Sequence, residues 1–127
     1  DMQRVFWICA AGALGTAARY LIGLWAGRRF GPGFPYGTLA VNLIGCFLIA
    51  VLVELGAARG WPDTTRLAIT VGFLGGFTTY SSFNNETMRL VGNGAVGAAS
   101  LNVLLTLVGG LAAGLLGMLF ARAVILR

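Results

Sequence analysis

Four long apolar segments fill most of the sequence, and they limit how the chain can fold more than any other feature. They span about residues 5–25, 37–57, 65–90 and 95–124, and Gly, Pro and Arg residues stand between them. A helix needs about 20 residues to cross about 30 Å of hydrocarbon, and each segment reaches that length. The sequence therefore predicts an all-α membrane protein: one domain over residues 1–127 with four transmembrane helices.

Composition supports the lipid bilayer as the solvent. Hydrophobic residues make up 57% of the chain and charged residues only 10%, which is too little charge to cover a soluble domain of this size. The net charge of +5 comes from arginine, since the sequence has no lysine and no histidine. The arginines are scattered at segment ends rather than gathered in one stripe, which argues against nucleic-acid binding. No nucleophile–base pair or metal-ligand cluster stands out, so we do not expect an enzyme.

The arginines say little about how the chain is oriented in the membrane. Four crossings place both termini on one side, and the positive charges divide with little asymmetry between the two sides. Orientation follows the bias of positive charge, which is weak here. Two interpretations stay open: a chain that inserts both ways and pairs as an antiparallel homodimer, or one fixed orientation with sparse loop charges. The arginines on the terminal side are Arg4, Arg59, Arg66, Arg122 and Arg127, and those on the other side are Arg28, Arg29 and Arg89.

Glycine recurs at helical spacing within the segments. Gly15 and Gly23 share one face of the first segment with Arg19, and Gly109 and Gly117 share a face of the fourth. Small residues at this spacing let helix backbones approach one another in lipid. We therefore expect close helix packing, within one chain or across a dimer.

The third segment contains a stretch that does not suit a helix interior. It reads G-F-L-G-G-F-T-T-Y-S-S-F-N-N-E-T over residues 72–87, with adjacent glycines followed by adjacent threonines. We predict that this helix is broken at mid-membrane, from Gly75 to Thr79. A break frees backbone carbonyls, which are good ligands for a hard cation such as Na⁺. The alternative, a continuous helix whose threonines bond to the preceding turn, is disfavoured because glycines and threonines coincide.

Polar side chains inside the segments form a possible relay for a small anion. Such an ion needs hydrogen-bond donors along its path, because stripping its water unaided is very costly. Asn102 and Thr106 are one helical turn apart, as are Thr38 and Asn42. The donors that can form the relay are Asn42, Ser81, Ser82, Asn102 and Thr106.

Three further residues have two interpretations each. Tyr80 and Phe83 share a helix face, where their positive ring edges can meet an anion or simply pack. Arg19 can draw anions into a vestibule or extend to the lipid headgroups. Glu86 lies late in the third segment, where it faces either the protein or the membrane interface.

Three strings of residues carry a resemblance to a known family. They are G-A-L-G-T-A-A-R-Y (residues 12–20), G-T-L-A-V-N-L-I-G (residues 37–45) and G-F-L-G-G-F-T-T-Y-S-S-F (residues 72–83). In this order and at this spacing they resemble the Fluc, or CrcB, family of fluoride channels, over essentially the whole chain. The resemblance implies a passive fluoride-selective channel, an antiparallel dual-topology homodimer with two pores, and export of fluoride across the bacterial inner (plasma) membrane.

The resemblance also implies roles for single residues. A structural Na⁺ at the dimer centre is held by the carbonyls of Gly75 and Thr78 from both subunits. The amide of Asn42 donates to fluoride, and Arg19 matches the arginine of the family's first helix. Together these residues would connect the interrupted helix to the ion pathway.

The aromatic pair and the polar track follow from the same resemblance. Tyr80 and Phe83 fall on the family's paired phenylalanines, and the hydroxyl of Tyr80 either adds a donor or blocks a position where a ring edge is expected. The polar track maps onto Ser82, Asn102 and Thr106. Asn102 stands where other members often have an aromatic hydroxyl.

One rival function also uses four short membrane helices. A small dual-topology, proton-coupled efflux transporter of the multidrug type needs a titratable carboxylate within the membrane. The first segment has no Asp or Glu, and Glu86 lies at the wrong end of the third. A structural subunit without transport would have no use for a polar track. The channel is therefore the favoured interpretation.

Overall fold

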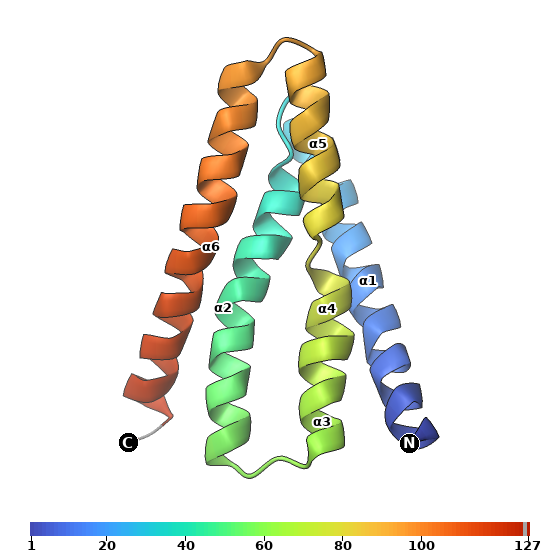
Figure 1. The fold of residues 1–127 in the computed structure, drawn as a ribbon, viewed down its shortest axis with the longest axis vertical. Coiled ribbons are helices and arrows are strands. Elements are labelled where there is room, and N and C mark those ends of the chain that lie inside the picture. Colours follow the sequence, from blue (N-terminus) through green and yellow to red (C-terminus); the bar gives the residue numbers. More distant parts are fainter. Residues whose placement is uncertain (126) are drawn as a thin grey trace.

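The computed structural model describes residues 1–125 and 127, and all regular secondary structure within them is helical (Figure 1). Three helices are long and uninterrupted: α1 (Met2–Phe30), α2 (Tyr36–Ala58) and α6 (Val96–Val124). The third apolar segment is divided into α3 (Asp63–Leu67), the π-helix η1 (Ala68–Leu74), α4 (Gly75–Phe77) and α5 (Tyr80–Gly92). The two ends of the chain lie at the same end of the molecule (Figure 1). The prediction of an all-helical protein is confirmed.

The three uninterrupted helices are each long and apolar enough to cross a membrane. Their large apolar side chains point outward to an extent that water would not tolerate; Leu111 of α6, for example, is 79% exposed. Lipid is the natural solvent for such a surface, because a helix satisfies its own backbone and needs only apolar side chains outside.

α1 is longer than its apolar core predicts. We expected a helix over residues 5–25, but α1 continues through Arg28 and Arg29 to Phe30. Cations in the last turn are favourable at the negative end of the helix dipole. The helix ends at Gly31, which has a positive φ of 77° that glycine adopts without strain. The end of the helix is thus set by Gly31.

Glycines bring helix backbones into direct contact, as their spacing predicts. A Cβ at Gly15 of α1 would lie 2.0 Å from the carbonyl oxygen of Phe73 in η1. A Cβ at Gly117 of α6 would lie 2.4 Å from the carbonyl oxygen of Phe47 in α2. Both distances are far too short for a real side chain, so only glycine permits these two close helix pairs.

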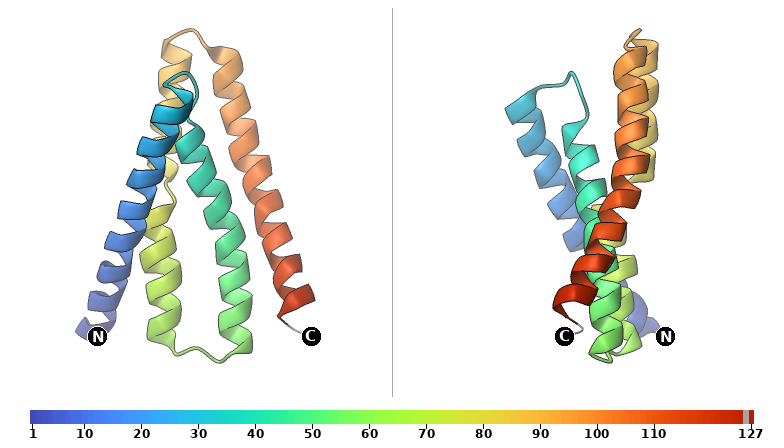
Figure 2. Two further views of the ribbon diagram at one scale, coloured as in Figure 1. Left: turned by 180° about the vertical axis from the view of Figure 1, so that it is seen from behind. Right: turned by 90° about the vertical axis from the view of Figure 1, so that its left-hand side faces the viewer.

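A two-residue linker joins α4 to α5. Thr78 (φ −93°, ψ 158°) and Thr79 (φ −153°, ψ 114°) have extended backbones, and we call them the α4–α5 linker. Gly75 and Gly76 are helical, although we placed both within the expected interruption. Gly76 instead serves packing, because a Cβ there would lie 2.5 Å from the Gly12 carbonyl oxygen. Seen from the side, α5 and α6 lean away from α1 and the start of α2 beyond the linker (Figure 2).

Candidate functional site

Asn42 of α2 pairs with the backbone of the α4–α5 linker. Its Nδ2 donates to the Thr79 carbonyl (3.0 Å), and its Oδ1 accepts from the Thr79 amide N–H (2.8 Å). In a continuous helix, that N–H would donate to the Gly75 carbonyl. The side-chain amide of Asn42 therefore takes the place of a helical neighbour and holds the linker extended, with one of its two N–H bonds left over.

The hydroxyl of Thr79 begins α5. Its Oγ1 accepts from the Ser82 amide N–H (3.2 Å) and donates to the Ser82 hydroxyl (3.0 Å), so Thr79 is the N-cap of this helix. The exposed Ser81 hydroxyl lies 3.5 Å from the same oxygen. The threonine that interrupts one helix thus starts the next, and it gathers two serine hydroxyls beside the linker.

Arg19 of α1 binds a carbonyl that the linker sets free. Its Nε donates to the Gly76 carbonyl (2.9 Å), which would accept from Tyr80 in a continuous helix. The carbonyls of Gly75 and Thr78 receive no hydrogen bond from any other group within residues 1–125. The linker therefore leaves oxygens that can serve as ligands to a hard cation.

A cavity of about 360 Å³ lies beside the linker, between α2, α4, α5 and α6. Asn42, Gly75, Thr78 and Thr79 line it, so the residues of the linker and its partner on α2 border the same space. The apolar part of its wall comes mainly from α2 and η1. The remaining lining residues are Gly45, Cys46, Ile49, Thr70, Leu74, Tyr80, Phe83 and Thr106.

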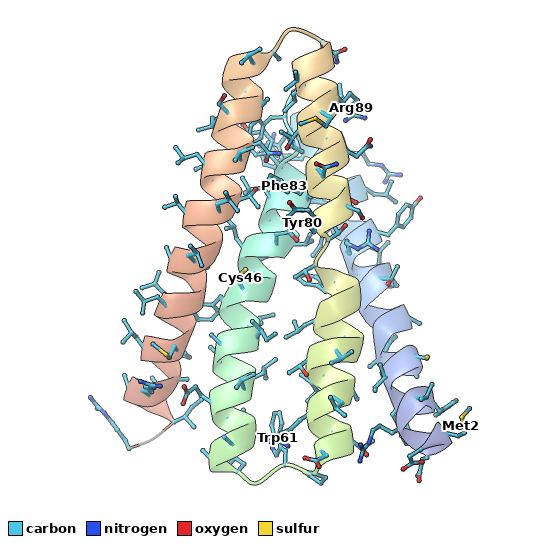
Figure 3. The ribbon with its side chains drawn as sticks, viewed as in Figure 1. Met2, Cys46, Trp61, Tyr80, Phe83 and Arg89 are labelled. Atoms are coloured by element: carbon cyan, nitrogen blue, oxygen red, sulfur yellow. The ribbon has the colours of Figure 1, made fainter. Side chains whose placement is uncertain are left out.

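Tyr80 and Phe83 lie next to one another at the start of α5, as their spacing predicts (Figure 3). Their ring centroids are 5.7 Å apart and the planes meet at 65°, an edge-to-face arrangement. Phe83 is buried, whereas Tyr80 is 77% exposed. Both rings border the cavity, and the phenol of Tyr80 extends beyond this chain's own packing.

The predicted donors of α6 divide into two kinds. Thr106 lines the cavity, and its hydroxyl is buried without a hydrogen-bond partner within the described residues. Asn102 is 1% exposed, and its Nδ2 donates to the hydroxyl of Thr87 (2.9 Å), which donates in turn to the Phe83 carbonyl (2.7 Å). Thr106 thus keeps an unused donor beside the cavity, while Asn102 connects α6 to the backbone of α5.

Glu86 faces the protein rather than the lipid. Its Oε1 accepts from the Thr38 hydroxyl (2.9 Å), and its Oε2 is buried without a partner in the described part of the chain. A second cavity of about 220 Å³ is lined by Arg19, Thr38, Ser82 and Glu86. Thr79 borders both cavities, so the linker separates a space beside α6 from a space beside α1.

Two residues that organise this site, Thr79 and Thr87, were not predicted to form these contacts. Thr79 caps α5, and a Thr just ahead of a new helix is a signal that we used only as a helix breaker. Thr87 lies on the same face of the helix as Tyr80 and Phe83, and this spacing is the signal that could have identified it. The cap formed by Thr79 depends on the exact residue at which α5 begins. The hydrogen bond between Thr87 and Asn102 depends on how α5 packs against α6.

Taken together, the long apolar helices and the polar spaces around an interrupted one define a multi-pass membrane protein of the channel or transporter class. The sequence model of the CrcB-like proteins, described as camphor resistance (CrcB), matches residues 6–118. The chain belongs to this CrcB family.

Three relatives are similar over nearly their whole length. A protein of Sorangium cellulosum is 51% identical over 125 residues, which is 98% of each chain. One of Citrifermentans bemidjiense is 46% identical over 123 residues, covering 96% of this chain and 99% of the relative. One of Agrobacterium fabrum is 43% identical over 122 residues, covering 95% and 98%. Each is named fluoride-specific ion channel FluC, which describes a channel and not an enzyme.

Proposed function

We propose that this protein is a passive fluoride-selective channel. The observation that carries the proposal is the cavity beside the α4–α5 linker, where hydroxyl and amide donors meet around freed backbone groups. Fluoride is small and strongly hydrated, so it can leave water only where protein donors replace that water. The name shared by the relatives points to the same ion.

The pathway runs along the predicted donors. Asn42 keeps one N–H after pairing with Thr79 and offers it to the ion. The Thr106 hydroxyl, which has no partner in the described chain, offers a second donor. Ring edges of Tyr80 and Phe83 line the space between them, with the Tyr80 hydroxyl as an added donor. The other residues of the proposed pathway are Ser81, Ser82 and Asn102, the last acting through Thr87.

Arg19 belongs to the vestibule in this proposal. Its Nε is held by the Gly76 carbonyl, while the side chain borders the cavity that also contains Ser82 and Thr38. A fixed positive charge at the mouth of a pore raises the local concentration of anions. Glu86 shares this cavity and opposes that effect, so the anion must pass on the Arg19 and Ser82 side.

The working unit in this proposal is an antiparallel, dual-topology homodimer with two pores. Two observations support it: the arginine charges are nearly balanced between the two ends of the chain, and Tyr80 extends out of its own subunit. A partner placed on the open side of the linker would cover Tyr80 and complete the wall of the cavity. The linker then lies near the middle of the bilayer.

A structural Na⁺ at the centre of the dimer is the second part of the proposal. The carbonyls of Gly75 and Thr78 fit such an ion, because they are hard oxygen ligands without another partner in residues 1–125. Sodium would supply positive charge that holds the two linkers together. We expect replacement of Na⁺ by a larger cation to lower fluoride efflux, and efflux that ignores the cation would remove this site from the account.

The proposed location is the bacterial inner membrane, where a passive channel would release fluoride that accumulates in the cytoplasm. The rival, a proton-coupled transporter, needs a carboxylate in the ion's path. No carboxylate lines the cavity that contains Asn42 and Thr106, and Glu86 is bonded to Thr38 in the other cavity. The channel explains the donors, whereas the transporter leaves them without a use.

Fluoride release from liposomes tests the proposal. Purified protein is reconstituted into vesicles loaded with KF, valinomycin is added to collapse the voltage, and a fluoride electrode follows efflux. We expect rapid release that needs no pH gradient. Folded protein that releases no fluoride would sink the assignment, and release only with an opposing proton gradient would favour the transporter.

A further inference from the structure

Another cavity, of about 410 Å³, lies toward the end of the molecule where both termini lie. It shares Thr70 with the cavity beside the linker but none of the residues of the proposed pathway. It is enclosed by the first turn of α1, the last turns of α2, and α3 with the start of η1. Figure 3 shows Trp61 between the adjoining ends of α2 and α3. Nothing in the proposed fluoride pathway uses this space.

Arg4 provides an unsatisfied donor in this cavity. Its Nε is buried and has no hydrogen-bond partner within the described residues. A guanidinium stays charged at any physiological pH and carries only donors, so burying one of its N–H groups without an acceptor is costly. The arrangement is explained if an oxygen of a bound anion accepts from Arg4.

The charges around Arg4 leave the cavity positive. Arg66 also lines it and pairs with Asp63, and these are the other charged residues of the wall. Two arginines and one aspartate leave one positive charge over. Arg66 pairs through one nitrogen, so further N–H groups of its guanidinium remain to bind an anion.

The rest of the wall is apolar and ends at a tryptophan. Leu52 and Val53 of α2 face Leu67 and Ile69 across the cavity. The Trp61 ring packs over Gly56, where a Cβ would lie 3.0 Å from its Cε3 atom. Tryptophan favours the level of the lipid headgroups, where one side is apolar and the other wet.

We infer that this cavity binds the phosphate of an anionic phospholipid, with Arg4 and Arg66 on the headgroup and the apolar wall along an acyl chain. A free phosphate ion shares the anion chemistry but would leave the apolar wall unused. A zwitterionic lipid would bring a cation against a cavity that is already positive. The inference depends on the membrane setting and does not depend on fluoride conduction.

Lipid binding by the purified full-length protein tests the inference. Native mass spectrometry and thermal unfolding in detergent are measured with added phosphatidylglycerol, phosphatidylcholine or inorganic phosphate. Phosphatidylglycerol should remain bound and raise the unfolding temperature, and the other two should do neither. Arg4→Gln should weaken phosphatidylglycerol binding about tenfold, the loss expected for one charge-assisted hydrogen bond.

A matched variant and a second substitution control for folding. Arg28→Gln removes an exposed arginine from the last turn of the same helix and should leave lipid binding unchanged. Arg4→Lys keeps the charge and should bind more weakly than wild type, because it lacks the planar donor group. Equal binding by wild type and both Arg4 variants would overturn the inference, as would equal stabilisation by inorganic phosphate or phosphatidylcholine.

Discussion

The two sides of the interrupted third segment use its glycines and polar groups in opposite ways. On the α1 side, Gly15 and Gly76 bring backbone against backbone, and there is no room for a methyl group. On the α2 and α6 side, a cavity of about 360 Å³ lies beside the same segment, and Asn42 and Thr106 are among the residues that line it. The α1 side of the segment is closely packed, whereas the α2 and α6 side borders a cavity whose lining includes hydrogen-bond donors.

This difference shows how a short chain can hold an extended linker among apolar helices. Close backbone packing holds η1 and α4 in place against α1. Backbone groups therefore lose their helical hydrogen bonds only around the α4–α5 linker, where other groups must satisfy them. Arg19, Asn42 and the Thr79 hydroxyl satisfy three of those groups: the Gly76 carbonyl and the amide N–H groups of Thr79 and Ser82. Gly75 and Thr78, whose carbonyls are left over within residues 1–125, are among the residues that line the cavity.

The largest expected effect is on the open face. Asn42→Asp should lower fluoride efflux at least about 100-fold, because a fixed negative charge repels the ion where water is scarce. The substitution also replaces the Nδ2 group that donates to the Thr79 carbonyl with an oxygen, which cannot donate. Asn85→Asp adds the same charge at an exposed position of α5 and should keep efflux near wild type. Wild-type efflux from Asn42→Asp would remove this residue from the pathway.

The packed face should respond in stability. Gly15→Ala should destabilise the protein by about 2–3 kcal/mol, because its Cβ meets the Phe73 backbone, which cannot rotate away. Gly27→Ala, in the same helix, has nothing within 4 Å of its Cβ and should change stability by less than about 1 kcal/mol. Thermal unfolding in detergent compares the two. Equal unfolding temperatures would contradict the close packing of α1 on η1.

Arg19 of α1 binds a carbonyl that the linker frees and should show an intermediate effect. Arg19→Gln should lower efflux about tenfold, through loss of a charged donor to the Gly76 carbonyl and of the vestibule charge. Arg19→Lys should restore only part of the efflux, because lysine returns the charge without the planar donor group. Full recovery with lysine would show that charge alone matters and that the Gly76 contact does not.

The smallest expected effect concerns the Tyr80 hydroxyl. Tyr80→Phe keeps the ring beside Phe83 and removes a single neutral donor, so efflux should fall by no more than about threefold. The initial rate of release from liposomes measures the change. A rise in efflux would mean that the hydroxyl obstructs the pathway and does not serve it.

Much of the fold could be predicted because it depends on local pattern. Apolar length locates α1, α2 and α6, and glycine spacing identifies contacts such as Gly15 and Gly117. Helix ends were predicted less well, since α1 continues beyond the expected range of residues 5–25 and ends at Gly31. The prediction was also wrong for the glycines near the linker: Gly75 and Gly76 have low helix propensity, yet both are helical, and Gly76 packs directly against Gly12 of α1.

The site was harder to predict because its contacts join distant parts of the chain. The side-chain amide of Asn42 predicted a hydrogen-bond donor. Its pairing with both backbone groups of Thr79 depends on how α2 packs against the linker. The same holds for the bond from Arg19 to Gly76 and for the bond from Asn102 to Thr87. Sequence indicated which residue types were out of place in lipid, and the packing of the helices decided what each one binds.

The most direct test of the central claim compares two anions in the same vesicles. Proteoliposomes loaded with KF or with KCl are treated with valinomycin, and ion-selective electrodes follow the release of each anion. A pathway built from closely placed hydroxyl and amide donors should release fluoride rapidly and retain chloride. Equal release of both anions, or release of neither by folded protein, would contradict the role given to the cavity beside the linker.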